Sequence, residues 1–345
     1  MVQKLLVVRN DKIGDFMLAW PALAHLKNAS PTPHISVLVP AYTAPLAEAC
    51  PWVDEVIIDP GNAAAPLAQR VLLEQIKAAR FDALLTLFST PRIGWLGWRA
   101  GIRLRVAPAT KWAQIFYNVR IRQRRSRSAK PEYQYNVELA CALINKLSLT
   151  QPAMPSPPYW PLETKQREYQ RKVLLESVQA NGGLLVVVHP GSGGSAVNLS
   201  LDQYADLVVQ IHHISKTQPI HWLISAGPNE HPQAQELIRL LANKSVEATH
   251  FPTRNSVEAY ALQLAGADML IAGSTGPLHI AGCLNIATAG FYPAKRSATS
   301  LRWQTCNSAK NRLYFSSSSS AAEKNMLAVD IDSAAKDISL FLSKY

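Results

Sequence analysis

The chain has 345 residues, 48% of them apolar, and a formal net charge of +11; this length and composition allow two domains with substantial hydrophobic cores. Its longest apolar runs, such as Leu184–Val188, are far too short to span a bilayer, and we expect no secretory leader because a strand-like run starts at Leu5. The four cysteines are scattered without a CxxC pair, so we expect free thiols in a reducing cytoplasm and neither a disulfide framework nor a zinc site. They are Cys50, Cys141, Cys283 and Cys306.

The first 150 residues alternate strand-like and helix-like segments. Strands are predicted at 5–9, 35–39, 56–58 and 83–87. Helices are predicted at 16–28, with a break near Pro21, and at 46–49, 67–79 and 135–146. This alternation predicts a parallel sheet that is covered by helices.

A stiff linker is predicted at 151–161, which holds five prolines, and the same rhythm restarts after it. The later strands are predicted at 184–188, 221–225, 269–271 and 287–291, and the later helices at 165–180, 201–214, 233–241, 257–264 and 331–343. We therefore expect an α/β protein with two Rossmann-like domains that face each other across a cleft. The N-terminal domain is expected at 1–160 with the linker, the C-terminal domain at 162–328, and a terminal segment, 329–345, is expected to pack its helix back on the N-terminal domain.

The positive charge is concentrated in one segment, because no acidic residue lies between Asp82 and Glu132. The eleven basic residues there are Arg92, Arg99, Arg103, Arg105, Lys111, Arg120, Arg122, Arg124, Arg125, Arg127 and Lys130. Such a segment predicts an anionic partner, which could be nucleic acid, anionic lipid or a phosphorylated glycan. Trp95, Trp98 and Trp112 interleave with the arginines; a place in the core is slightly favoured for them, and a lipid interface is the alternative.

The turn after the first strand, Arg9–Asp15, contains candidate residues for proton transfer. Asp15 lies near the start of the next helix, where its carboxylate could act as a general base or could cap the helix. Asp11 is the competing carboxylate, and Lys12 could hold a phosphate or neutralise Asp11.

Two strand-end loops in the second half are suited to anions or sugars. The loop His189–Ala196 contains Ser192, Gly193 and Ser195, whose amides and hydroxyls could surround an anion, and a flexible loop is the alternative. It lacks both the GK[ST] ending of a P-loop and the spacing of GxGxxG. Glu230 ends the second loop and could contact a ribose or a base edge, or could be an exposed turn residue.

The most informative motif is Ser274–Ala281, which follows an apolar strand and predicts the start of a helix. Ser274 or Thr275 can cap this helix, Gly276 lets a ligand approach the backbone, and Pro277 suits the first turn. A helix N-terminus attracts phosphate, so the motif predicts a diphosphate site.

His279 could face this phosphate or be buried in the core. Taken together, the strand-end loops predict a nucleotide diphosphate on the second domain and an acidic residue of the first domain opposite it. That is the layout of a glycosyltransferase with two Rossmann-like domains.

The chain resembles the ADP-heptose:lipopolysaccharide heptosyltransferases of glycosyltransferase family 9. The resemblance runs from about residue 4 to about residue 295 and rests on Arg9–Asp15 followed by Pro21-Ala22-Leu23, His189–Ser192, Ala226–Glu230 and Ser274–Ala281. It implies a GT-B fold, an inverting mechanism, no required metal and no cofactor. It also implies that Asp15 is the catalytic base, because Asp15 matches the base proposed for the family. The implied donor-binding residues are Ser192, Gly193, Ser195, Glu230, Ser274, Thr275, Gly276, Pro277 and His279.

The same resemblance implies the partners. The donor is ADP-heptose, and the acceptor is the Kdo- and phosphate-bearing inner core of lipopolysaccharide; no nucleic acid is expected. Such an enzyme is peripheral at the cytoplasmic face of the inner membrane. The expected acceptor-binding residues are Lys12, Arg120, Arg122 and Arg124.

The chain departs from the family pattern at two donor positions. Many members have Lys or Arg near Val197, and many heptosyltransferases have Asp at the position of Ser274. Lys12, Lys295 or Arg296 could replace the missing cation. The alternatives are a different nucleotide sugar as donor, or a member that binds a sugar nucleotide without turnover.

Two other classes of protein fit the sequence less well. A nucleic-acid-binding protein would explain the basic segment, but no RRM, KH, zinc-finger or helix-turn-helix motif accompanies it. An NAD-dependent oxidoreductase would need GxGxxG after the first strand, where this chain has Asn10–Asp15.

Overall fold

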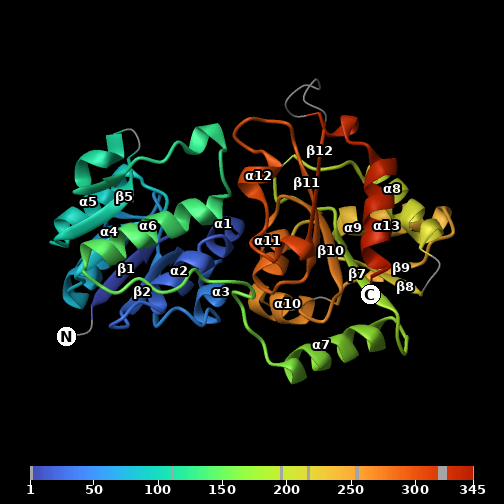
Figure 1. Ribbon diagram of the computed structural model, residues 1–345, viewed down its shortest axis with the longest axis horizontal. Helices are drawn as coiled ribbons and strands as arrows, with labels where there is room; N and C mark the ends of the chain where they lie inside the picture. Colours follow the sequence, from blue (N-terminus) through green and yellow to red (C-terminus); the bar gives the residue numbers. More distant parts are fainter. Residues whose placement is uncertain are drawn as a thin grey trace. The chain divides into compact units, whose positions relative to one another are not determined.

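The computed structural model describes residues 3–109, 112–194, 197–215, 218–252, 256–317 and 325–344. It divides into two compact units, each an α/β unit with one six-stranded parallel sheet (Figure 1). Unit 1 comprises Met1–Arg125 and Lys130–Tyr159, and unit 2 comprises Ser126–Ala129 and Trp160–Tyr345. The predicted fold class, two Rossmann-like α/β units, is confirmed.

The sheet of unit 1 has the strand order β3-β2-β1-β4-β5-β6. Its strands are β1 (Lys4–Val8), β2 (His34–Pro40), β3 (Glu55–Asp59), β4 (Ala83–Thr86), β5 (Leu104–Pro108) and β6 (Val119–Ile121). Its helices are α1 (Ile13–Met17), α2 (Trp20–Lys27), α3 (Ala44–Glu48), α4 (Pro66–Ala79), α5 (Pro91–Arg99) and α6 (Glu132–Lys146), with the 3-10 turns η1 (Trp112–Phe116) and η2 (Arg125–Arg127). The strand order reverses between β1 and β4, and ligands of such sheets bind at the carboxyl ends of the strands at this reversal.

The sheet of unit 2 repeats this order, because β9-β8-β7-β10-β11-β12 corresponds strand for strand to unit 1. Its strands are β7 (Leu184–His189), β8 (Ile220–Ile224), β9 (Ala248–His250), β10 (Met269–Gly273), β11 (Ala287–Tyr292) and β12 (Arg312–Ser316). Its helices are α7 (Thr164–Ser177), α8 (Leu201–Ile214), α9 (His231–Asn243), α10 (Val257–Leu264), α11 (Gly276–Cys283), α12 (Ser300–Trp303) and α13 (Ile331–Leu342), with the 3-10 turns η3 (Ala309–Asn311) and η4 (Met326–Ala328). The reversal point here lies between β7 and β10.

The central strands are largely apolar, as expected for parallel sheets that helices cover on both faces. Every residue of β7, β10 and β11 is buried. The predicted helix over 16–28 is split into α1 and α2, and Pro21 stands in the first turn of α2, where its missing N–H leaves no helical hydrogen bond unmade. The break predicted near Pro21 is therefore confirmed.

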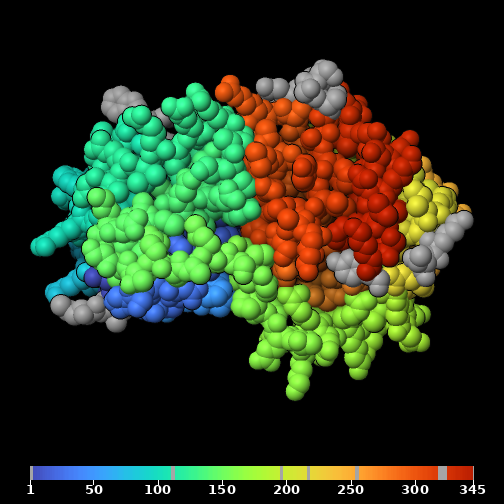
Figure 2. All heavy atoms as spheres, in the orientation of Figure 1, coloured from blue at the N-terminus to red at the C-terminus, as the bar shows by residue number. Residues whose placement is uncertain are grey.

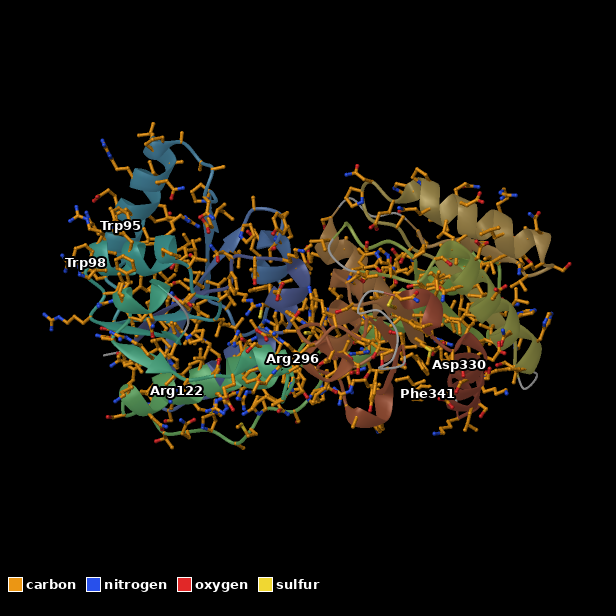
Figure 3. The ribbon with its side chains drawn as sticks, turned by 90° about the horizontal axis from the view of Figure 1, so that it is seen from above. Trp95, Trp98, Arg122, Arg296, Asp330 and Phe341 are labelled. Atoms are coloured by element: carbon orange, nitrogen blue, oxygen red, sulfur yellow. The ribbon has the colours of Figure 1, made fainter. Side chains whose placement is uncertain are left out.

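The terminal helix packs within unit 2, on α8, so the predicted packing on the N-terminal domain is wrong. Asp330 caps α13 by accepting a hydrogen bond from the Ser333 amide at 2.9 Å. The apolar face of the helix, with Ile338 and Phe341, joins the core of unit 2 (Figure 3). An amphipathic helix identifies its own apolar face but not the surface that covers it, and here that surface belongs to the same unit as the helix.

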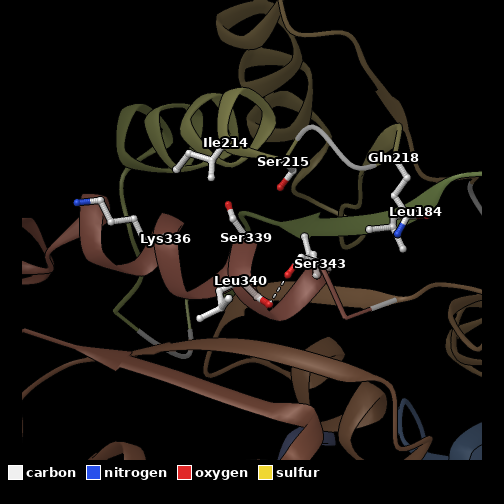
Figure 4. A pocket seen from close by; sticks show the side chains of 9 residues that line it. Leu184, Ile214, Ser215, Gln218, Lys336, Ser339, Leu340 and Ser343 are labelled. Carbon is white, nitrogen blue, oxygen red and sulfur yellow. Dashed lines mark hydrogen bonds between the residues drawn. The ribbon is translucent and has the colours of Figure 1, made fainter.

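A hollow of about 270 Å³ remains between α13, α8 and the start of β7 (Figure 4). Leu184 and Lys336 line it, and Leu184 is the first residue of β7. The hollow therefore lies at the amino end of the sheet, away from the edge where parallel sheets bind their ligands. Within the part of the chain that the structure describes, every helix falls short of the length and apolar character that a membrane span requires.

Candidate active site

A buried arginine organises the carboxyl end of the first sheet. Arg9 follows β1, is 3% exposed, and makes ion pairs with three carboxylates. Its Nη2 lies 2.5 Å from Asp15 Oδ1, its Nε lies 2.9 Å from Asp11 Oδ1, and its Nη1 lies 3.4 Å from Glu132 Oε1. A guanidinium without partners would be very costly to bury, so the carboxylates account for its position. They also raise the pKa of Arg9 although its burial opposes this.

Asp15 lies in the first turn of α1, but it does not cap this helix. The N-cap is Lys12, and the Asp15 carboxylate instead accepts a hydrogen bond from Arg9. The Asp15 side chain remains 15% exposed, so solvent or a ligand reaches it. The helix-cap interpretation of Asp15 is wrong, and its role as a base stays a prediction.

The carboxyl group of Asp11 has a higher pKa than that of an ordinary surface aspartate. Burial, helped by the charge of Asp15 and opposed by Arg9, raises the pKa of Asp11 to about 6. The hydroxyl of Tyr42 donates a hydrogen bond to the Asp11 carbonyl oxygen and closes the turn. The cluster thus combines a permanent cation with a carboxyl group that titrates near neutral pH.

The basic segment contributes to the interior of this cluster as well as to the surface. Arg125 Nη1 lies 2.6 Å from Glu132 Oε1 and 3.0 Å from the Leu87 carbonyl oxygen, at the end of β4. Glu132 is therefore shared by two arginines that are 116 positions apart in the sequence (125 and 9). The sequence predicted neither Arg9 nor Glu132 as a site residue. For Arg9 the available signal was its position as a charged residue directly after an apolar strand; nothing local pointed to Glu132.

A second buried pair flanks the cluster at the end of β3. Asp59 forms an ion pair with Arg92 from the first turn of α5 and accepts a hydrogen bond from Asn10 at 2.5 Å. Burial of Asp59 raises its pKa, but these hydrogen bonds outweigh burial and lower the pKa overall. Arg92 thus links α5 to the turn that carries Asp11 and Asp15.

In unit 2, one carboxylate joins the loops that follow β7 and β8. Glu230 Oε1 accepts a hydrogen bond from the Gly193 amide at 2.6 Å, and Oε2 accepts one from the Gly227 amide at 2.8 Å. A Cβ at Gly191 would lie 2.0 Å from Glu230 Oε2, so this contact requires glycine there. Glu230 is 9% exposed, and its interpretation as an exposed turn residue is wrong.

His189 and Asn198 also stabilise the loops that follow β7 and β8. His189 Nε2 lies 3.4 Å from Glu230 Oε2, and its Nδ1 lies 3.0 Å from the Ser225 hydroxyl oxygen. Burial lowers the pKa of His189, against the opposing effect of Glu230. Asn198 Nδ2 donates to the carbonyl oxygens of Pro190 at 2.8 Å and of Gly191 at 3.2 Å. In the sequence, this position was noted only because the cation that many family members have near Val197 is missing. In the structure, the side-chain amide of Asn198 fixes the loop after β7.

The start of α11 has the predicted form. Thr275 is the N-cap in an extended conformation, Gly276 is the first helical residue, and Pro277 lies in the first turn. Thr275 is 4% exposed, and its hydroxyl makes no hydrogen bond within the part of the chain that the structure describes. Ser274 is half-buried at the junction of β10 and α11, and His279 is buried.

The remaining predicted donor residues lie in the loop after β7. Ser192 is half-buried, and Gly193 is exposed with φ of 53°, in the left-handed region that favours glycine. Gly194 follows with φ of 68°. Ser195 lies outside the described residues.

The predicted acceptor residues are all exposed and belong to unit 1. Lys12 is the N-cap of α1, and Arg120 lies on β6, where its Nε donates to the Tyr117 carbonyl oxygen at 2.8 Å. Arg122 and Arg124 follow β6. The preferred core placement of the tryptophans is wrong for two of them, since Trp95 is 42% and Trp98 is 53% exposed. The side chain of Trp112 lies outside the described residues.

Each unit thus has the Rossmann strand order and polar loops at the carboxyl ends of its central strands, and two such units in one chain are the architecture of GT-B glycosyltransferases. The sequence profile of glycosyltransferase family 9 (heptosyltransferase) matches residues 69–324. The chain is 43% identical to a Haemophilus influenzae protein named "Putative glycosyltransferase", over 99% of this chain and 97% of that protein. The chain belongs to glycosyltransferase family 9 and is a glycosyltransferase.

Solved structures confirm the fold. The Escherichia coli ADP-heptose lipopolysaccharide heptosyltransferase II superposes with a TM-score of 0.74 at 16% identity, covering 99% of both chains. A glycosyltransferase family 9 protein from Veillonella parvula gives 0.79 at 14% identity, covering 99% of this chain and 98% of that one. The E. coli heptosyltransferase WaaC, solved with ADP, gives 0.71 at 17% identity and covers 99% of both chains.

Proposed function

We propose that this glycosyltransferase moves a heptose from ADP-heptose to the anionic inner core of lipopolysaccharide, with inversion at the anomeric carbon and with Asp15 as general base. The observation that carries the proposal is the position of the Asp15 carboxylate, 2.5 Å from Arg9 Nη2 at the carboxyl end of β1 and 15% exposed. A base needs a fixed position and access to the proton that it removes. The hydrogen bond from Arg9 fixes the position of the Asp15 carboxylate, and its partial exposure gives it access to the proton.

In the proposed step, Asp15 takes the proton of an acceptor hydroxyl as the hydroxyl oxygen attacks the anomeric carbon of the donor. The bond from that carbon to the diphosphate oxygen breaks, and ADP leaves. Positioned base catalysis supplies roughly 10²–10⁴-fold in rate. The remainder comes from orienting the two sugars and from stabilising the charge on the leaving diphosphate.

We assign the donor to unit 2. The first amides of α11 and the Thr275 hydroxyl are suited to the diphosphate, because a helix N-terminus carries unpaired N–H groups and partial positive charge. The amides and hydroxyls of the loop after β7 complete this site. The proposed donor residues are Ser192, Gly193, Ser195, Glu230, Ser274, Thr275, Gly276, Pro277 and His279. Lys295, in the loop three residues after β11, is the candidate for the cation that many family members have near Val197. No metal or cofactor is part of this proposal.

We assign the phosphorylated acceptor to Lys12, Arg120, Arg122 and Arg124, and the enzyme to the cytoplasmic face of the inner membrane as a peripheral protein. The exposed guanidinium groups and the absence of acidic residues between Asp82 and Glu132 support an anionic acceptor. Reversing the charges of Arg120, Arg122 and Arg124 together is expected to raise the acceptor KM and to leave donor affinity unchanged. Unchanged acceptor kinetics would remove these residues from the acceptor site.

A thermal-shift panel with ADP-heptose, ADP-glucose, UDP, GDP and dTDP sugars tests the donor assignment. We expect the melting temperature to rise with ADP sugars, and most with ADP-heptose, because a ligand that binds only the native state stabilises it. A response to a UDP, GDP or dTDP sugar alone would contradict the adenine nucleotide. An equal response to ADP-glucose and ADP-heptose would contradict heptose as the donor sugar.

A further inference from the structure

The helix α5 presents its largest apolar side chains to solvent. Trp95 and Trp98 are three residues apart, so they lie on one face of the helix, with exposed fractions of 42% and 53%. The opposite face, which carries Ile93 and Leu96, is buried. Figure 3 shows the two tryptophans close together at the margin of unit 1.

Two glycines explain why the indoles cannot turn inward. A Cβ at Gly94 would lie 2.8 Å from Phe116 Cβ, and one at Gly97 would lie 2.4 Å from Leu84 Cδ2. The buried face of α5 therefore packs backbone against its neighbours and leaves no volume for a large ring. The exposed tryptophans are thus an outer surface, and a pair of exposed indoles calls for a partner.

The end of α5, the loop after it and the turn η1 also carry exposed basic and aliphatic side chains. Arg99 ends α5, and Arg103 follows it in the loop to β5; both are exposed. The Arg103 carbonyl oxygen accepts a hydrogen bond from Asn118 Nδ2 at 2.6 Å, which brings this loop beside the segment after η1. Ile115 of η1, a turn that packs on α5, is 64% exposed. We call Trp95, Trp98, Arg99, Arg103 and Ile115 the aromatic-basic surface.

The charge of the segment 92–130 is of one sign in the sequence, although carboxylates from outside the segment pair with three of its basic residues, Arg92, Arg125 and Lys130. Residues 92–109 and 113–125 contribute a broad outer surface of unit 1 (Figure 2, teal to green). The sequence of the whole segment 92–130 contains basic residues without an acidic one. Indole rings favour the headgroup level of a bilayer, and a basic residue near an anionic leaflet contributes about 1 kcal/mol. Aliphatic Ile115 adds apolar area, which favours a lipid surface over the stacked bases of a nucleic acid.

We propose that the aromatic-basic surface docks unit 1 on an anionic phospholipid bilayer, with both indoles at the headgroup level. This inference rests on the proposed function, because a glycolipid acceptor is held in such a bilayer. The geometry of α5 fits that use: Arg92 in its first turn pairs with Asp59 beside the Arg9 cluster. Trp95 and Trp98 follow Arg92 at about 4.5 and 9 Å along the helix axis. The docked surface thus begins within about two helical turns of the pair that flanks the proposed base.

Vesicle co-sedimentation of the full chain tests the proposal, with equimolar phosphatidylcholine and phosphatidylglycerol against phosphatidylcholine alone. We expect the native chain to bind the anionic vesicles and to be released by high salt. The double variant Trp95→Gln/Trp98→Gln and the double variant Arg99→Glu/Arg103→Glu are each expected to lower the partition coefficient by on the order of tenfold. The matched control is Tyr169→Gln, which removes a 64% exposed ring from α7 of unit 2 and leaves partition unchanged.

A second readout separates insertion from loss of folding. Brominated phosphatidylglycerol is expected to quench the tryptophan fluorescence of the native chain, and Trp95→Phe/Trp98→Phe is expected to abolish that quenching with an unchanged circular dichroism spectrum. Equal partition of native and tryptophan variants would overturn the proposal. So would binding of a short RNA that depends on the tryptophans while vesicles are ignored. Turnover of a delipidated, water-soluble acceptor does not involve this surface, so a failed vesicle assay with normal turnover leaves the proposed function standing.

Discussion

The two sheets share one strand order but use the carboxyl ends of their strands differently. In unit 1 the edge is built from charged side chains, with Arg9 among Asp11, Asp15 and Glu132. In unit 2 it is built from glycine-rich backbone, which Glu230 holds through the amides of Gly193 and Gly227. Proton transfer needs a side chain of defined position and pKa, and a diphosphate needs several N–H donors at close approach. The comparison shows that one topology can carry two different polar edges, which suit the two tasks that we propose.

The two edges also differ in their tolerance of change. The Arg9 side chain is 2% exposed, and a neutral residue there leaves the largely buried carboxylates of Asp11 and Asp15 without their cation. The amides of the unit 2 loops come from the backbone, so substitutions there act mainly through the side chains that hold the loops in place. Substitutions in unit 1 are therefore expected to have the larger effects.

The largest effect is expected from Asp15→Asn. This change keeps the size of the side chain and removes the base, so kcat should fall by roughly 10²–10⁴-fold while donor affinity persists. Steady-state kinetics and calorimetric titration with the donor measure the two quantities. The matched control is Asp11→Asn, which alters the other aspartate bonded to Arg9. If Asp11→Asn causes the larger loss of kcat, the base is Asp11.

Replacing Arg9 with Met should lower the free energy of unfolding by about 3–5 kcal/mol, because it leaves buried charges uncompensated. Urea denaturation checks this. The control is Arg171→Met in unit 2: Arg171 binds Asp268 at 2.8 Å, but its side chain is 35% exposed, so a smaller loss is expected. Equal losses in the two variants would show that the burial of Arg9 does not increase its contribution to the free energy of unfolding.

Glu230→Gln tests the edge of unit 2. The variant keeps one acceptor oxygen but loses the charge that two amides and His189 face, and a hydrogen bond to a charged group is worth about 1.5–3 kcal/mol. The donor KM should rise by about tenfold with a smaller change in kcat. Glu236→Gln, on the exposed side of α9, serves as the control. Identical donor KM values for both variants would mean that Glu230 does not organise the donor loops.

Much of the fold could be predicted from the sequence, because long buried segments have clear periodicity. The predicted helices 201–214 and 257–264 have the observed bounds of α8 and α10. The sequence did not predict the helix α5 or the strands β5, β6, β9 and β12. Basic residues interrupt the apolar pattern of α5, β5 and β6, and β6 and β9 have only three residues each. The partner of α13 could not be predicted, because amphipathic periodicity does not encode which surface is covered.

The sequence predicted which motifs form the site, but not which side chains contact each other within it. The loops around Asp15, Glu230 and Thr275 fall at strand ends as expected. The Arg9–Glu132 contact joins residues 123 positions apart, and nothing local in the sequence relates them. Similarly, the sequence alone indicates only a flexible loop at Gly191, and the structure shows that the Glu230 carboxylate packs against this glycine.

The smallest expected effect concerns the pH dependence of unit 1. The pKa of Asp11 is raised to about 6, so between its ordinary value near 4 and that value the native state binds more protons than the unfolded state. The contribution of Asp11 to the free energy of unfolding therefore falls as the pH rises through this window, by at most about 1.4 kcal/mol per pH unit. Asp11→Asn removes the titration, so the stability of the native chain relative to this variant should decrease from pH 4 to pH 6. Urea denaturation at half-unit intervals measures it, with Asp332→Asn on α13 as the control. A difference that grows with pH would mean that the attraction of Arg9 outweighs burial and lowers the pKa of Asp11.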